Sequence, residues 1–252
     1  MKTFKKDQLT VEIYENRTLM GEAAAKDIKT KIAQILNEKT EANIVFAAAP
    51  SQNDVLKALV EDKSIDWGKI NAYHMDEYIG LGNGAPQAFG NFLNAHIFDL
   101  VPFKSINYID ATAVDAEKEA ERYASILQEN PADIVIMGIG ENGHIAFNDP
   151  PVADFNDEKL VKAVPLDEIC RQQQVNDGCF EKIEQVPTHA ITLTIPALVK
   201  APNLFCIVPA KTKANAVRET LTGSIDEHCP ASILRTRKGA KLYLDNESSK
   251  LL

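Results

Sequence analysis

The chain has 252 residues, enough for one large α/β domain or two small ones, and its 45% hydrophobic and 25% charged residues are ordinary for a globular protein. A net charge of −9 argues against broad nucleic-acid binding and against docking on anionic membranes, because both need a basic face. The charge does not exclude a small anionic ligand, since a few lysines and backbone N–H groups capture one anion.

The four cysteines show neither C-x-x-C spacing nor a zinc-type Cys/His cluster, so we expect reduced thiols, no metal and a cytoplasmic location. Cys206 lies in the apolar run "LFCIV" and is expected to be buried. The N-terminal stretch lacks the apolar core of a signal peptide, and no run approaches the roughly 18 apolar residues of a membrane span.

The apolar pattern alternates between strands and helices along the chain. It first predicts a strand at 9–14, a helix at 18–36, a strand at 43–49 and a helix that Ser51 caps, with Asp54 completing a loose capping box. Next come a strand at 69–75, a loop at 76–86, a helix at 87–98, a strand at 106–110, a helix at 114–129 and a buried strand at 133–138. A polar segment at about 150–188, with a helix around "DEICRQQQ", precedes a strand at 190–195, a helix at 196–201, a strand at 203–209, a helix at 212–223 and a strand at 240–245.

These repeated β–α units predict an α/β fold of one domain over 1–252, in which a mostly parallel sheet carries helices on both faces and 150–188 forms an inserted flap. Ligands of such sheets bind beyond the carboxyl ends of the strands. Three polar loops follow strands there: "AAAPSQND" (47–54), "DEYIGLG" (76–82) and "GENGHIAFNDPP" (140–151). We therefore expect the three loops to meet at one ligand site.

Gly138, at the end of the strand at 133–138, and Gly140 and Gly143 of the third loop match the glycine spacing of a dinucleotide-binding fingerprint. That fingerprint needs a helix after its last glycine, and Pro150 and Pro151 stop any helix almost at once. We therefore reject a dinucleotide cofactor. The glycines instead let the backbone turn sharply and approach a ligand closely.

Two of the loops carry side chains suited to proton transfer. Histidine serves that purpose near neutral pH, and His144 is accompanied by Asn142, which can orient its ring, and by Asp149. Asp76 and Glu77 are adjacent carboxylates, and we expect at least one to face a cleft, where burial raises its pKa towards that of a base. Taken singly, a hydrogen-bonded histidine in a tight loop and a solvated acidic turn remain open alternatives. His74 also fits the edge of the core.

The first loop leads into a helix N-terminus, which is a natural seat for an anion. Ser51 and Gln52 add side-chain donors there, and Lys213, which follows the strand at 203–209, can add positive charge. Ordinary capping by Ser51 and a solvated lysine are the alternatives.

The stretches "NAYHMDEYIGL" and "MGIGENGHIAFNDP" resemble the two signature stretches of the glucosamine-6-phosphate deaminase/isomerase family, a branch of the group that contains the 6-phosphogluconolactonases. The stretches "VPTHAITLTIPAL" and "VPAKTKANAV" fit the same order, so the resemblance covers nearly the whole chain. It implies a Rossmann-like three-layer α/β/α sandwich without metal or organic cofactor. The family often forms oligomers, so a homo-oligomer is one expectation.

The family's reaction opens a 2-amino sugar 6-phosphate, isomerises aldose to ketose and releases ammonia. By resemblance, Asp76 matches the base that moves a proton between C2 and C1, and His144 matches the histidine that assists ring opening. Asp149 stands where the family has a glutamate that supports this histidine, and Lys213 matches a phosphate-binding lysine. The remaining expected substrate contacts are Ala49, Ser51, Gln52, Glu77 and Gly140.

The chain departs from the family at three places. Asn142 replaces an aspartate; an amide orients an imidazole but does not stabilise an imidazolium by charge, which predicts slower ring opening or an altered chemistry. The Gly- and Thr-rich phosphate loop reads "AAAPSQND" here, where Cβ atoms and Pro50 obstruct a backbone cradle. The flap arginine of the deaminases is missing near "NDGCF", with Arg171 as a loose candidate. We therefore expect a rebuilt phosphate site.

The preferred function is an aldose–ketose isomerase/deaminase acting on a phosphorylated amino sugar such as glucosamine 6-phosphate or galactosamine 6-phosphate. One alternative is a lactone hydrolase like the 6-phosphogluconolactonases, in which His144 activates water; the stretch "AFNDP" argues against it. The other is a non-catalytic sugar-phosphate sensor. Asn142 and the altered phosphate loop favour it, whereas the intact Asp76 and the lack of a helix-turn-helix argue against it.

Overall fold

The computed structural model describes residues 1–82 and 84–252 and contains two β-sheets. The larger sheet has the order β1-β2-β11-β10-β7-β3-β4-β6, and only β1 runs antiparallel to its neighbour. Its strands are β1 (Lys2–Lys6), β2 (Leu9–Tyr14), β3 (Ala42–Phe46), β4 (Ile70–His74), β6 (Ser105–Asn107), β7 (Ile134–Met137), β10 (Asn203–Val208) and β11 (Ala240–Asp245). The predicted mostly parallel sheet is confirmed.

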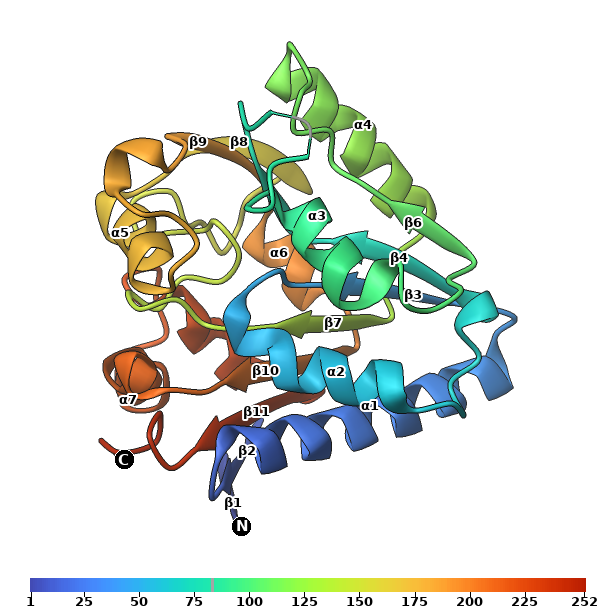
Figure 1. Ribbon diagram of the computed structural model, residues 1–252. Coiled ribbons are helices and arrows are strands. Elements are labelled where there is room, and N and C mark those ends of the chain that lie inside the picture. Colours follow the sequence, from blue (N-terminus) through green and yellow to red (C-terminus); the bar gives the residue numbers. More distant parts are fainter. Residues whose placement is uncertain (83) are drawn as a thin grey trace.

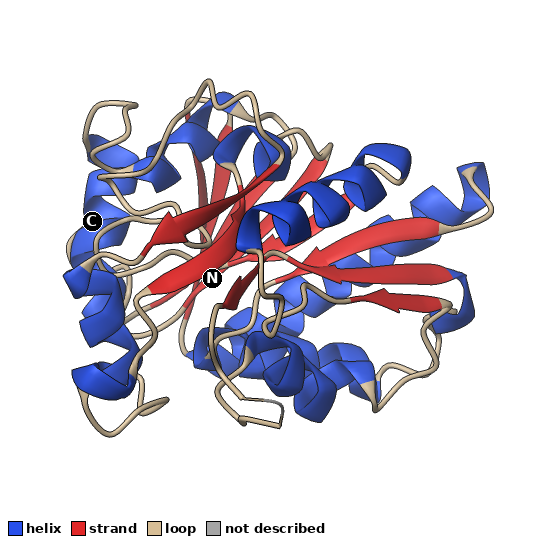
Figure 2. Ribbon diagram, turned by 90° about the horizontal axis from the view of Figure 1, so that it is seen from above, coloured by secondary structure: helices blue, strands red, loops and turns tan. Residues whose placement is uncertain are grey.

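Helices cover both faces of this sheet, as Figure 2 shows from above. They are α1 (Arg17–Glu38), α2 (Asn53–Glu61), α3 (Phe89–Leu93), α4 (Ala116–Glu129), α5 (Glu168–Asn176), α6 (Ile195–Val199) and α7 (Ala214–Thr222). Apolar side chains of α1, α2 and α3 pack on one face, and those of α4, α6 and α7 on the other. Successive residues of β7 alternate between these two cores, because side chains alternate across a strand. The three-layer α/β arrangement is thereby confirmed.

A second, antiparallel sheet of order β5-β9-β8 stands at the carboxyl end of the parallel strands. Its strands are β5 (Asp76–Tyr78), β9 (His189–Leu193) and β8 (Val161–Pro165). The expected loop at 76–86 is therefore wrong at its start, because the acidic pair pairs its backbone with β9; residue 83 of that loop lies outside the described residues. The strand near 190–195 exists, but it belongs to this sheet.

The segment 150–188 is more regular than expected, since it holds β8 as well as α5. Figure 1 places α5 beside β8 and β9, at the same end of the large sheet as α7. The strand β1 was missed, because its lysine-rich sequence "KTFKK" reads as polar; lysines are typical of an exposed sheet edge.

Capping by Ser51 is also wrong. Pro50–Gln52 form a 3₁₀ turn before α2, and the Ser51 hydroxyl accepts a hydrogen bond from the Gln52 amide instead. Cys206 is fully buried, as expected. Among the helices of 1–82 and 84–252, none combines the length and apolar character needed to cross a membrane.

Candidate active site

One cavity lies where the three polar loops meet at the carboxyl end of the sheet. Six of the expected site residues line it: Ala49, Ser51, Asp76, Gly140, His144 and Lys213. Segments far apart in the chain thus place a carboxyl group, an imidazole and an ammonium group around one space. Four other expected residues, Gln52, Glu77, Asn142 and Asp149, stand behind the cavity wall and are not part of its lining.

Asp76 reaches the cavity from β5, where its backbone pairs with Thr192 of β9. It is almost fully buried, and burial raises the pKa of its carboxyl group well above the ordinary value, with Glu77 adding to the rise. A carboxyl group whose pKa lies closer to neutrality is a better proton acceptor and donor at physiological pH. Asp76 is therefore suited to general acid–base work on a ligand in the cavity.

His74, at the end of β4, fixes the backbone next to Asp76. Its Nδ1 lies 2.8 Å from the carbonyl oxygen of Asp76, and its Nε2 lies 2.9 Å from the backbone nitrogen of Ile109. The carbonyl only accepts and the amide only donates, so the ring carries its proton on Nδ1. Complete burial lowers its pKa to about 4, which keeps the ring neutral. This positioning role went unassigned in the sequence because it depends on Ile109, 35 residues away.

Glu77 points away from the cavity, towards the start of α3. Its carboxylate accepts hydrogen bonds from the backbone N–H groups of Tyr78, Phe89 and Gly90 at 2.8–2.9 Å. Burial raises its pKa, and the three donors partly offset that rise. The structure does not bring Glu77 to the expected substrate-binding position, because these backbone donors occupy its oxygens.

His144 is held by Asn142 and Asp149. Its Nδ1 lies 2.7 Å from Oδ1 of Asn142 and 2.8 Å from Oδ1 of Asp149. The Asn142 amide donates to the same Asp149 oxygen at 2.9 Å, and the His144 backbone N–H donates to Oδ1 of Asn142. Two acceptors around Nδ1 place the ring proton there and leave Nε2 for the cavity.

The carboxylate of Asp149 is buried, and opposing effects act on its pKa. Burial acts to raise its pKa, but His144 and the hydrogen bonds from His144, Asn142 and Cys170 outweigh it, so the pKa is lowered. Asp149 thus stays ionised and places its negative charge beside the imidazole of His144.

Gly140 makes room for the His144 ring. A Cβ atom at Gly140 would lie 2.1 Å from the ring, closer than any real contact. The Gly140 N–H donates to the carbonyl oxygen of His144, and the left-handed Gly143 completes the turn. The chain then continues through turns towards β8 rather than into a helix, so it lacks the helix that a dinucleotide site needs.

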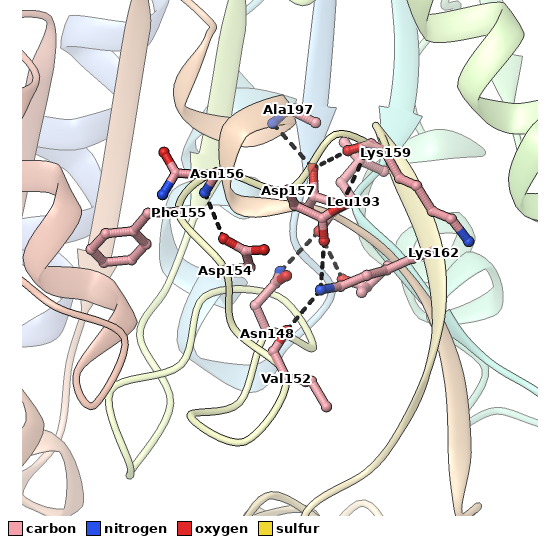
Figure 3. Close-up of polar contacts among 12 residues, drawn as sticks. Asn148, Val152, Asp154, Phe155, Asn156, Asp157, Lys159, Lys162, Leu193 and Ala197 are labelled. Atoms are coloured by element: carbon pink, nitrogen blue, oxygen red, sulfur yellow. Dashed lines mark hydrogen bonds and ion pairs between the residues drawn. The ribbon is translucent and has the colours of Figure 1, made fainter.

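The segment after His144 is tied to the second sheet, as Figure 3 shows. The buried Asn148 amide donates to the carbonyl oxygens of Ile145 and Leu193. Further along, the Lys162 ammonium donates to the carbonyl oxygen of Val152 at 2.7 Å and to the Asp157 carboxylate at 2.8 Å. These bonds fix the loop on β8 and β9 and so hold Asp149 against His144.

The opposite part of the cavity wall carries positive charge. Lys213 is almost fully buried, and burial lowers its pKa, while the nearby acids Asp177 and Glu141 act to raise it. None of the ion pairs found in the described part of the chain includes Lys213, so its ammonium is available to a ligand. Gln52 supports the adjacent Ser51: its amide donates to Ser51 Oγ and to the carbonyl oxygen of Ile207.

Several lining residues had no signal in the sequence. Arg17 comes from the start of α1, and Gln173, Gln174 and Asp177 come from the segment 150–188. Arg171, the loose candidate for the phosphate, instead donates to the carbonyl oxygens of Ile183 and Val186 and braces its own segment.

The described residues contain one group with metal-ligand atoms close together: His144, Asp149 and Cys170, within 4.8 Å of one another. Burial raises the pKa of the Cys170 thiol well above its ordinary range, and a protonated thiol is a poor metal ligand. The contact between His144 and Asp149 is better explained as the hydrogen bond that orients the ring.

Comparisons with known proteins agree on one family. The model of the family described as glucosamine-6-phosphate isomerases/6-phosphogluconolactonase matches residues 15–243. The glucosamine-6-phosphate deaminase of Streptococcus sanguinis (strain SK36) is 34% identical over 238 residues, 94% of this chain and 97% of its own. That of Listeria monocytogenes serotype 4a is 34% identical over 212 residues, 84% of this chain and 88% of its own.

Two solved structures extend the comparison. A monomeric glucosamine-6-phosphate deaminase superposes with a TM-score of 0.87 at 27% identity, covering 96% of this chain and 99% of the other. The 6-phosphogluconolactonase of Thermotoga maritima superposes with a TM-score of 0.75 at 22% identity, covering 94% and 99%. The 6-phosphogluconolactonase thus shares its fold with this chain.

Proposed function

The chain belongs to the family of glucosamine-6-phosphate isomerases and 6-phosphogluconolactonases, and from this premise we propose that it is an aldose–ketose isomerase/deaminase of a 2-amino sugar 6-phosphate. The observation that carries the proposal is that Asp76 and His144 line the same cavity. The curated relatives at 34% identity are glucosamine-6-phosphate deaminases, which favours glucosamine 6-phosphate and its C4 epimer galactosamine 6-phosphate as substrates.

The reaction divides between the two sides of the cavity. Nε2 of His144 takes the proton of the C1 hydroxyl group and passes it to the ring oxygen as the C1–O5 bond of the cyclic sugar breaks, so that C1 becomes an aldehyde. Asp76 then removes the proton from C2 of the open aldehyde and returns it to C1, while a proton passes from the amino nitrogen to O1, which leaves a hydroxyl group on C1 and an imine at C2. Water adds to this carbon, and ammonia leaves with the ketose as the other product.

The positioning residues follow from the contacts described above. Asp149 and Asn142 hold the His144 ring and its proton. His74 holds the backbone of Asp76. Lys213 and Ser51, with Ala49 beside them, receive the phosphate, and residues 150–188 act as the flap through α5. Because sugar phosphates are charged and do not diffuse across membranes, a cytoplasmic location is part of the proposal.

The test is an assay of ammonia release and ketose formation with glucosamine 6-phosphate and galactosamine 6-phosphate. We expect turnover with at least one sugar and a loss of at least 100-fold in kcat for Asp76→Asn, in line with the roughly 10²–10⁴-fold contribution of general acid–base catalysis. Clear binding of both sugars without any turnover would contradict the proposal.

A lactone hydrolase is the second candidate, because the fold is shared with 6-phosphogluconolactonases. In that reaction His144 activates a water molecule, and no proton moves between C2 and C1. Hydrolysis of 6-phosphogluconolactone that survives Asp76→Asn and is lost in His144→Gln would favour this function over the first.

A further inference from the structure

Arg17 reaches the cavity from an element that the sequence did not connect with the site. It is the first residue of α1, directly after β2, and it lines the cavity together with Ser51 and Lys213. Its Nη2 donates to the carbonyl oxygen of Pro50 at 2.9 Å, and its Nε lies 2.6 Å from Oδ2 of Asp54. The guanidinium group is therefore fixed against the loop at 47–54.

The fixed guanidinium group retains unused donors. A guanidinium group carries five N–H bonds, and the contacts to Pro50 and Asp54 use two of them. Within the described part of the chain, Nη1 has no hydrogen-bond partner, and the side chain of Arg17 is 44% exposed. The free edge of the group is thus available for a planar, two-point contact with an oxyanion.

The neighbouring helix is built to hold this arrangement. Gly21 lies one turn along α1 from Arg17, on the same face of the helix. A Cβ atom at Gly21 would lie 2.6 Å from Cβ of Asp54, so only glycine lets α2 approach α1 this closely. The close crossing of the two helices brings the Asp54 carboxylate to the guanidinium group of Arg17.

The loop itself supplies few donors for an anion. Pro50 has no N–H, and the backbone N–H groups of Ala47 and Gln52 are taken by the carbonyl oxygens of Ile136 and Ala49. Charge for an anion at this end of the cavity must therefore come from side chains. Lys213 supplies one cation, and Arg17 is the second one in the cavity lining.

We propose that Arg17 is a direct ligand of the substrate's phosphate, oriented by Asp54, and that together with Lys213 it replaces a backbone phosphate cradle. The ligand class is a phosphate monoester on the terminal carbon of a sugar. This inference rests on the proposed function for the identity of the sugar, but it makes its own claim about oxyanion binding. The competing explanation is that Arg17 and Asp54 only join α1 to α2.

The test compares Arg17→Ala and Arg17→Lys with Arg237→Ala, an exposed arginine that precedes β11 at the opposite end of the sheet. Calorimetry measures the Kd of inorganic phosphate, and steady-state kinetics measure KM and kcat with glucosamine 6-phosphate. We expect Arg17→Ala to weaken phosphate binding and to raise KM by about tenfold or more, because a charge-assisted hydrogen bond is lost. The phosphate Kd and the KM of Arg17→Lys should fall between those of the wild type and Arg17→Ala. In both Arg17 variants kcat should stay within about threefold of the wild type, and Arg237→Ala should match the wild type in all three quantities.

A second variant, Asp54→Asn, keeps Arg17 but removes its ion pair, and we expect phosphate binding to weaken by a smaller factor than in Arg17→Ala. Circular dichroism establishes that each variant is folded. A phosphate Kd of Arg17→Ala within twofold of the wild type overturns the inference, as does a wild type that does not bind inorganic phosphate. If Arg17→Ala weakens phosphate binding but the wild type turns over no amino sugar phosphate, the inference stands and the proposed deaminase function fails.

Discussion

The ring of His74 links the backbone at Asp76 to that at Ile109: Nδ1 lies 2.8 Å from the carbonyl oxygen of Asp76, and Nε2 lies 2.9 Å from the Ile109 nitrogen. The backbone at His74 is itself held by the Tyr123 hydroxyl, which donates to the His74 carbonyl oxygen at 2.9 Å and accepts from its N–H. The strand β4 therefore ends in a rigid polar connection, and Met75 alone separates His74 from Asp76, the first residue of β5.

Replacing His74 by phenylalanine tests this connection. The variant leaves the Asp76 carbonyl and the Ile109 N–H buried without partners, and each unsatisfied group costs about 1–3 kcal/mol. We expect urea unfolding to show a loss of about 2–6 kcal/mol in the free energy of unfolding. We also expect kcat to fall because Asp76 loses its position. His228→Phe, at a fully exposed histidine, is the control and should change neither quantity.

Asp76→Asn should lower kcat by at least about 100-fold and stabilise the fold at neutral pH. The pKa of Asp76 is raised in the folded state, mainly by burial, so the folded protein binds this proton more tightly than the unfolded chain. Stability is then lost as pH rises from the unfolded pKa of about 3.9 to the raised folded value. An amide at position 76 does not ionise, so the variant's advantage in the free energy of unfolding should grow from pH 4 to pH 8 in denaturant titrations.

Glu77→Gln provides the matched control for this prediction. Glu77 is also buried, but its carboxylate accepts three backbone hydrogen bonds. An amide has only one oxygen to accept them, so this variant should unfold more easily than the wild type at pH 7. If Asp76→Asn is destabilised to the same extent as Glu77→Gln, then ionisation of the buried Asp76 carboxyl group does not reduce the stability of the wild type at neutral pH.

Sequence reasoning predicted the elements of the large sheet well, because long apolar runs such as "DIVIMG" and the periodic residues of α1 depend on local pattern alone. It failed at β5, where an acidic sequence forms a strand only because β9 lies alongside. The residues of the site also fall into those that a local motif predicts and those that only the tertiary structure reveals. Motif residues such as His144 and Lys213 were found, whereas Arg17 and Asp177 reach the cavity through tertiary packing that no local pattern encodes.

Gly140→Ala should disable the site through one methyl group. The new Cβ would overlap the His144 ring, which must then leave its place between Asn142 and Asp149. We expect kcat to fall by at least about 100-fold, the lower range of a general acid–base contribution. Gly82→Ala is the control, because a Cβ there meets no atom of residues 1–82 and 84–252 within 4 Å, and it should retain wild-type kinetics. Equal activity of the two variants would contradict the described packing of the ring.

Asn142→Asp tests the amide that stands where the family has an aspartate. In the wild type the Asn142 amide donates to Asp149 Oδ1, and its own Oδ1 faces Nδ1 of His144. A carboxylate at this position removes the donor and sets two negative charges beside one imidazole.

Two opposite effects should follow from Asn142→Asp. The added charge stabilises an imidazolium, so ring opening by His144 should become faster, which is measurable as a higher kcat if that step limits turnover. The two carboxylates also repel each other, so the free energy of unfolding at pH 8 should fall by about 1–3 kcal/mol. The deficit should shrink at pH 5, because a close carboxylate pair takes up a shared proton at a raised pKa and the repulsion is relieved. An equal deficit at both pH values would mean that the lost hydrogen bond, rather than the charge, sets the cost, and that the amide is retained for its donor alone.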